Sequence, residues 1–97
     1  MIIRIVKMTF KEEELETFQS LFDQHKDLIR AFEGVQKLEL LRDKSNPNIF
    51  FTYSIWEDES QLVHYRNSVL FKKVWGQTKA LFKEKAEAWS VNKEISI

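Results

Sequence analysis

The segment IFFTYSIW, residues 49–56, decides the fold because both of its alternating faces are largely apolar or aromatic. Side chains of a β-strand point alternately to opposite sheet faces, which gives one set with Ile49, Phe51, Tyr53 and Ile55 and a second with Phe50, Thr52, Ser54 and Trp56. Neither set suits full exposure to water. We therefore expect protein to cover both faces of the sheet.

The neighbouring segments complete a sheet around this strand. Residues 35–42 also have a β-type pattern, and the turn formers at 43–48 join them to residues 49–56 as a hairpin. Residues 2–9 are rich in β-branched side chains and place Ile2, Arg4, Val6 and Met8 on one face. The alternation at residues 89–97 predicts a last strand.

Helical spacing occupies the stretches between these strands. One helix is predicted to begin near Phe10, with Thr9 and Glu12 as a capping box, and to end at Gly34 as a residue with positive φ. Its apolar stripe consists of Leu15, Phe18, Leu21, Phe22, His25, Leu28, Ile29 and Phe32. A short helix capped by Asp58 is expected to reach Arg66, and one capped by Ser68 to reach about Lys85. A packing reason is expected for Gly76 inside the second of these.

The order strand, helix, strand, strand, helix, strand predicts an α+β fold, a ferredoxin-like βαββαβ protomer with a four-stranded antiparallel sheet and helices on one face. The 97 residues are expected to form a single domain, 1–97. The other sheet face would remain uncovered. We expect a homodimer in which the two faces bearing Phe51 and Tyr53 bury one another.

Composition excludes several function classes. Fifteen basic and fifteen acidic side chains give zero net charge, which argues against a nucleic-acid partner. The sequence has no cysteine and therefore no disulfide or thiolate chemistry. Arg4 and Lys7 interrupt the apolar start, so neither a signal peptide nor a membrane span is expected, and a cytoplasmic location is the default. Eight Phe, three Trp and two Tyr exceed the needs of so small a core and indicate a further burial surface, an interface or a cavity, although one aromatic-rich monomer core is the plain alternative.

The candidate functional residues are those that helix and strand phases turn toward the space between sheet and helices. Candidate catalytic residues are His25, Tyr65 and Trp56, and candidate substrate-binding residues are Phe18, Phe22, Phe50, Thr52, Ser54 and Trp75. An imidazole within an apolar stripe can exchange protons near neutral pH, but a hydrogen-bonded structural histidine is the plainer reading of His25. Trp56 suits stacking on a flat ligand or simple core packing. Tyr65 is favoured over His64 for the inward position, and Arg66 is expected to extend toward solvent.

The sequence lacks the residue patterns of metal sites, nucleotide-binding loops and hydrolase active sites. Neither histidine belongs to a set with metal-ligand spacing, so no metal is expected. The two glycines are isolated, and no serine lies in a nucleophile-elbow context, which removes nucleotide-dependent and hydrolase classes. No cofactor is expected.

The middle and the second half of the chain, Glu33 to Trp89, resemble the antibiotic biosynthesis monooxygenase family of dimeric α/β-barrel proteins. The resemblance rests on Gly34, preceded here by Glu33 where the family usually has proline, and on LLRD at 40–43, Pro47-Asn48, YSIWEDE at 53–59, Leu62, Tyr65-Arg66, Ser68 and Phe71. It implies a ferredoxin-like protomer, a barrel formed by two sheets, and a pocket in each subunit between sheet and helices.

The resemblance does not carry over any catalytic set complete. Trp56 matches a tryptophan of the haem-degrading branch, but Val6 and Trp75 stand near the positions of its asparagine and histidine. The branch that oxygenates polycyclic phenols has an asparagine where this chain has Thr52, and the signal-isomerase pattern has histidines at Tyr65 and Leu70.

Two functions follow as hypotheses. The first is a cofactor-independent monooxygenase-like protein that binds a small aromatic or quinone-like molecule. The second is a non-catalytic dimeric binding or stress-associated module of the same fold.

Overall fold

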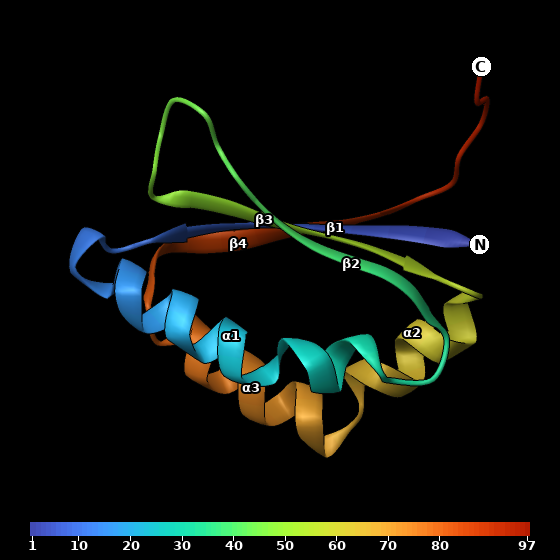
Figure 1. The fold of residues 1–97 in the computed structure, drawn as a ribbon, viewed down its shortest axis with the longest axis horizontal. Helices are drawn as coiled ribbons and strands as arrows, with labels where there is room; N and C mark the ends of the chain where they lie inside the picture. Colours follow the sequence, from blue (N-terminus) through green and yellow to red (C-terminus); the bar gives the residue numbers. More distant parts are fainter.

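The computed structural model describes residues 1–97 as one antiparallel sheet covered on one face by helices (Figure 1). The strands are β1 (Ile2–Phe10), β2 (Val35–Arg42), β3 (Ile49–Trp56) and β4 (Phe82–Val91). The helical elements are the 3₁₀ turn η1 (Glu12–Glu14), α1 (Leu15–Arg30), α2 (Glu59–Arg66) and α3 (Val69–Lys79). The sheet order is β2-β3-β1-β4, with every neighbouring pair antiparallel. This is the predicted ferredoxin-like arrangement.

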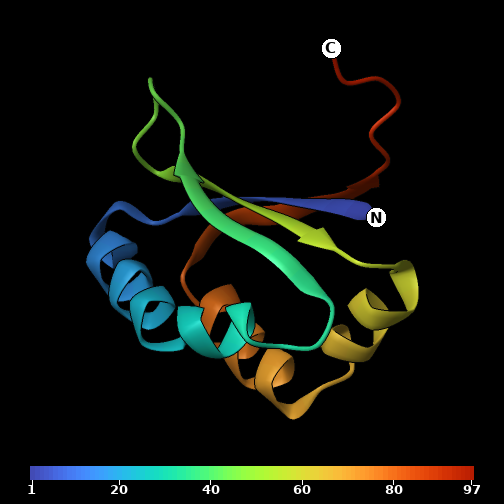
Figure 2. The same cartoon turned by 45° about the vertical axis from the view of Figure 1, so that its right-hand side comes forward.

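The hairpin and the alternation of β3 are confirmed. The sheet face of β3 that meets the helices carries Phe50, Ser54 and Trp56, all of them buried. Figure 2 shows all helices on this side, while the 43–48 loop and the last residues project from the opposite side. One sheet face therefore belongs to the core and the other lies open.

Two apolar clusters hold the helices on the sheet. One is centred on Trp56 and contains Ile29, Val35, Trp56, Leu62 and Tyr65. The other contains Met8, Phe10, Phe18 and Phe50, in which the rings of Phe10 and Phe18 stack with centroids 4.1 Å apart. Burying rings of this size supplies most of the stabilisation available to such a short chain.

The predicted capping box of the first helix is wrong. Thr9 lies in β1, paired with Ile49 and Glu84, and its side chain is buried. The strand continues to the fully buried Phe10, and α1 begins only at Leu15, after the 3₁₀ turn and without a side-chain cap. Burial of the Phe10 ring outweighs the local capping preference.

The predicted end of the same helix is also too late. Gly34 has the expected positive φ of 94°, but α1 ends at Arg30 and Gly34 lies in the turn that leads into β2. Its carbonyl accepts a hydrogen bond of 2.8 Å from the backbone N–H of Glu57, which fastens this turn to the end of β3.

The caps of the next two helices are confirmed, but the predicted end of α3 is wrong. Oδ1 of Asp58 accepts from the backbone N–H of Gln61, and Oγ of Ser68 from that of Phe71. α3 stops at Lys79 rather than Lys85, and β4 occupies 82–91 rather than 89–97. The segment KEKAEA at 83–88 consists of good helix formers, yet its pairing with β1 overrides that propensity. The expected packing reason for Gly76 is likewise wrong, because a Cβ there would meet open space.

No helix of the structure is long and apolar enough to span a bilayer.

Candidate functional site

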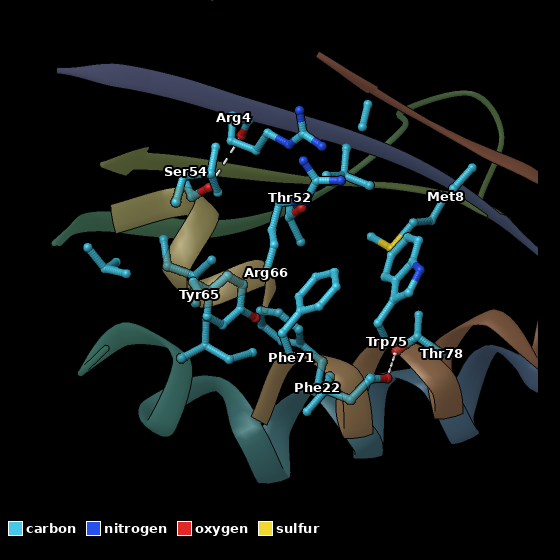
Figure 3. A pocket seen from close by; sticks show the side chains of 18 of the residues that line it. Arg4, Met8, Phe22, Thr52, Ser54, Tyr65, Arg66, Phe71, Trp75 and Thr78 are labelled. Carbon is cyan, nitrogen blue, oxygen red and sulfur yellow. Dashed lines mark hydrogen bonds between the residues drawn. The ribbon is translucent and has the colours of Figure 1, made fainter. Parts of the chain in front are cut away.

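A cavity of about 290 Å³ lies between the sheet and the helices (Figure 3). Twenty residues line it, and fifteen of them are hydrophobic. Its aromatic wall consists of Phe18, Phe22, Trp56, Tyr65, Phe71 and Trp75. All three helices and all four strands contribute to the wall, so the whole fold positions it. Its size approaches the lower end of the range for small-molecule sites.

Trp56 is held in a fixed orientation. Its side chain is 2 % exposed, and its indole Nε1 donates a 3.0 Å hydrogen bond to Oγ of Ser54. That hydroxyl in turn donates to the backbone carbonyl of Arg4 at 3.4 Å. The hydroxyl of Ser54 therefore fixes the orientation of the indole. The face of the Trp56 ring is the part that borders the cavity.

Tyr65 brings an unpaired hydroxyl to the cavity wall. Its ring lies 5.1 Å from that of Trp56, and its phenolic oxygen has no hydrogen-bond partner in the protein. Burial disfavours the phenolate and raises the pKa of Tyr65 to about 12. The phenol therefore keeps its proton at neutral pH and can donate a hydrogen bond to a bound oxygen atom.

Of the nine candidates predicted from the sequence, the cavity brings seven together. Besides Trp56, Tyr65 and Ser54, the wall includes Phe18, Phe22, Thr52 and Trp75. Trp75 stacks on Phe71 with ring centroids 5.8 Å apart and an interplanar angle of 12°.

His25 and Phe50 do not line the cavity. The imidazole is buried on α1, where Nδ1 lies 2.8 Å from the carbonyl oxygen of Leu21. Phe50 belongs to the cluster around Phe10, and the guanidinium of Arg42 lies 4.8 Å from its ring centroid. Both side chains support the walls from behind.

Two arginines of the site were missed. Arg4 and Arg66 both line the cavity, although the sequence pattern predicts neither as a site residue. Arg66 is exposed, in agreement with its predicted extension toward solvent. The signal for Arg4 was its phase, since it shares a strand face with Val6 and Met8, which also line the cavity. Because the other side chains of this strand face are apolar, the pattern indicates a core face and gives no local sign that its one charged residue borders a cavity.

The sheet order and the aromatic cavity define the class: a ferredoxin-like α+β protein with a cavity between the sheet and the helices. Comparison with protein families matches residues 1–75 to the antibiotic biosynthesis monooxygenase family. The chain belongs to this family, as the sequence pattern indicated. No curated protein sequence matches it.

Solved structures share the fold at low sequence identity. A conserved protein from Methanosarcina mazei Go1 is 23 % identical with a TM-score of 0.90, covering 96 % of this chain and 93 % of that one. An antibiotic biosynthesis monooxygenase is 16 % identical, also with a TM-score of 0.90, covering 96 % and 98 %. SnoaB, a cofactor-independent oxygenase from Streptomyces nogalater, is 16 % identical with a TM-score of 0.87, covering 99 % and 95 %. These similarities establish the fold of the chain.

Proposed function

We propose that the protein binds a flat aromatic or quinone-like molecule in the cavity and oxygenates it without a cofactor. The observation that carries this proposal is the cavity itself, about 290 Å³ of space bounded by aromatic rings in a domain of only 97 residues. A site with this wall favours a planar apolar ligand over a sugar or a metal complex. The similarity in fold to a cofactor-independent oxygenase supports the same reading.

The proposed chemistry depends on a substrate that is itself easily oxidised. An electron-rich phenolate or enolate can add O₂ at a carbon that still carries a hydrogen, which gives a hydroperoxide after protonation. Loss of that hydrogen as a proton then breaks the O–O bond, so that the carbon becomes a carbonyl, the other oxygen atom leaves as water, and the substrate itself supplies all four electrons. Trp56 would orient the substrate ring, and the Tyr65 hydroxyl would donate a hydrogen bond to the substrate oxygen on which negative charge resides. His25 does not line the cavity, so we assign it a structural role in α1.

Oxygen uptake in the presence of hydroxyquinones and polycyclic phenols tests the proposal. We expect oxygen uptake with the native protein. The rate of uptake should fall about tenfold or more in Tyr65→Phe, because this variant loses one hydrogen bond to the oxyanion. Tyr53→Phe is the matched control, because Tyr53 lies on the opposite sheet face and does not line the cavity. If the native protein takes up no more oxygen than a Trp56→Phe variant, oxygenation is refuted.

A specific observation favours the second candidate, a non-catalytic binding module. The cavity wall contains no His, Asp, Glu or Lys, and Tyr65 keeps its proton, so the wall offers no group suited to take a proton near pH 7. Calorimetric binding of the same phenols without oxygen consumption would support this module.

We also propose that two copies associate through the open sheet face. Phe51, Tyr53 and Trp89 lie on this face, where Lys7 and Glu87 form an ion pair of 3.9 Å and Nζ of Lys37 lies 5.9 Å from the Tyr53 ring centroid. The side chain of Trp89 is 45 % exposed. A second identical sheet would cover these rings and allow charges at the rim to pair.

A further inference from the structure

The charged residues of the cavity are all of one sign. Arg4 on β1 and Arg66 on α2 are the only ionisable side chains in its wall apart from Tyr65. Figure 3 shows Arg66 reaching from the helix layer toward the sheet, where the Arg4 side chain meets it near Thr52. The remaining wall is mostly apolar and has three further polar side chains, those of Thr52, Ser54 and Thr78.

Neither guanidinium has an acidic partner. The three ion pairs of the structure join Lys7 to Glu87, Lys26 to Asp23 and Lys37 to Glu39. Arg4 donates one hydrogen bond, from Nη1 to Oγ of Ser90 at 3.0 Å, and Arg66 makes none with its side chain. A guanidinium has five N–H donors, so most of those at this end of the cavity are available to a ligand.

The two positive charges also act on one another. Partial burial and the nearby charge of Arg66 hold the pKa of Arg4 below its usual value, although the group stays protonated at neutral pH. Two like charges without a counter-charge are unfavourable, and an anion between them would remove that repulsion. Arg66 is exposed and Arg4 half-buried, so a charged group placed here keeps contact with water.

We propose that the ligand is an aromatic carboxylate, its ring held by Trp56 and the neighbouring aromatic wall and its carboxylate bound by Arg4 and Arg66. A planar carboxylate matches the fork of N–H donors on a guanidinium and pairs with it in a bidentate manner. The inference rests on the proposed function for the aromatic part of the ligand and adds the charge and its position.

Calorimetric titration with naphthalene-2-carboxylate and its neutral analogue naphthalene-2-carboxamide tests this assignment. The native protein should bind the carboxylate about tenfold or more tightly than the amide, as expected for a charge-assisted hydrogen-bonded pair. Arg66→Gln should reduce that preference to about threefold or less. Arg4→Gln should act in the same direction, with circular dichroism as the check on folding.

Arg42→Gln is the charge-matched control. Arg42 is exposed, does not line the cavity, and donates from Nε to the carbonyl of Pro47 at 2.8 Å. The preference for the carboxylate should survive in this variant. Equal binding of both probes by the native protein would overturn the carboxylate assignment and leave the aromatic pocket intact. Binding of neither probe would instead count against the proposed function, because the ring itself would then find no site.

Discussion

At the scale of single residues, the turn at Gly34 is the tightest constraint in the chain. Gly34 has a φ of 94°, and a Cβ built on it would lie 2.6 Å from Cβ of Gln61. The turn joins α1 to β2 and packs against α2, so three elements that carry cavity residues depend on it. Only glycine satisfies both the backbone angle and the close approach.

Gly34→Ala should lower the free energy of unfolding by roughly 2 kcal/mol or more, since the left-handed backbone and the overlap with Gln61 both disfavour a Cβ. Gly76→Ala is the matched control. It should raise stability by about 0.5–1 kcal/mol, because Gly76 lies in α3 with open space around it. Urea unfolding of the two variants measures both changes, and a neutral Gly34→Ala would contradict the role of this turn.

The Tyr65 hydroxyl should lose its proton at a higher pH than an exposed tyrosine does. In a Tyr53→Phe variant, where Tyr65 is the one remaining tyrosine, absorbance of the phenolate should appear around pH 12 rather than pH 10, because burial disfavours the charge. A midpoint near pH 10 would mean that the phenol is hydrated.

The same burial makes stability depend on pH. The folded pKa of Tyr65 is raised, so its contribution is complete below about pH 10 and is lost as the pH rises through 12, on the order of 2–3 kcal/mol in total. Comparing urea unfolding of the native protein and Tyr65→Phe at pH 9 and pH 11 isolates the effect. If the difference in unfolding free energy between the native protein and Tyr65→Phe is the same at pH 9 and pH 11, this pH dependence is refuted.

At the scale of secondary-structure elements, the starts of helices are predicted correctly where a capping side chain is present. Asp58 and Ser68 lie where two helices begin, and each side chain makes the expected hydrogen bond. The hairpin strands follow from alternation and turn formers alone. Where local signals conflict with long-range pairing, as at Thr9 and at 83–88, the pairing with β1 and β3 prevails, and no local pattern records it.

The cap at Ser68 should matter for both stability and ligand binding. Its Oγ accepts from the Phe71 N–H at 3.1 Å and donates to the carbonyl of Tyr65 at 2.6 Å, so it joins two helices of the cavity wall. Ser68→Ala should cost about 1 kcal/mol in unfolding free energy and weaken aromatic ligand binding by a few-fold. Ser20→Ala is the control, at an exposed serine of α1 that does not line the cavity. Equal unfolding midpoints for the two variants would contradict the prediction.

At the scale of the whole molecule, the sequence predicts the two-sided sheet, because the β3 alternation leaves no polar face. It also predicts most of the aromatic cavity wall. It places the polar Thr52 and Ser54 in the wall correctly, but it does not distinguish Arg4, which lines the cavity, from His25, which does not, since both lie within apolar stripes. The location of a charge depends on tertiary contacts that no single segment encodes.

Association through the open face should be sensitive to one charge at its centre. Tyr53→Glu should give a monomer in sedimentation velocity experiments at micromolar concentration, because a buried carboxylate without a partner is costly in a two-fold interface, where it meets its own copy. Val69→Glu is the control, because Val69 is 84 % exposed at the start of α3, on the helix side. A native protein that sediments as a monomer would exclude this interface.

The three tryptophans lie in different surroundings, and this gives the chain built-in optical reporters. Trp56 and Trp75 both line the cavity, Trp56 with only 2 % of its surface exposed, and Trp89 lies on the open sheet face. Variants that keep one indole each would resolve two events by emission alone. A ligand should quench Trp75 and leave Trp89 unaffected, while dimer dissociation should shift Trp89 to the red and expose it to acrylamide.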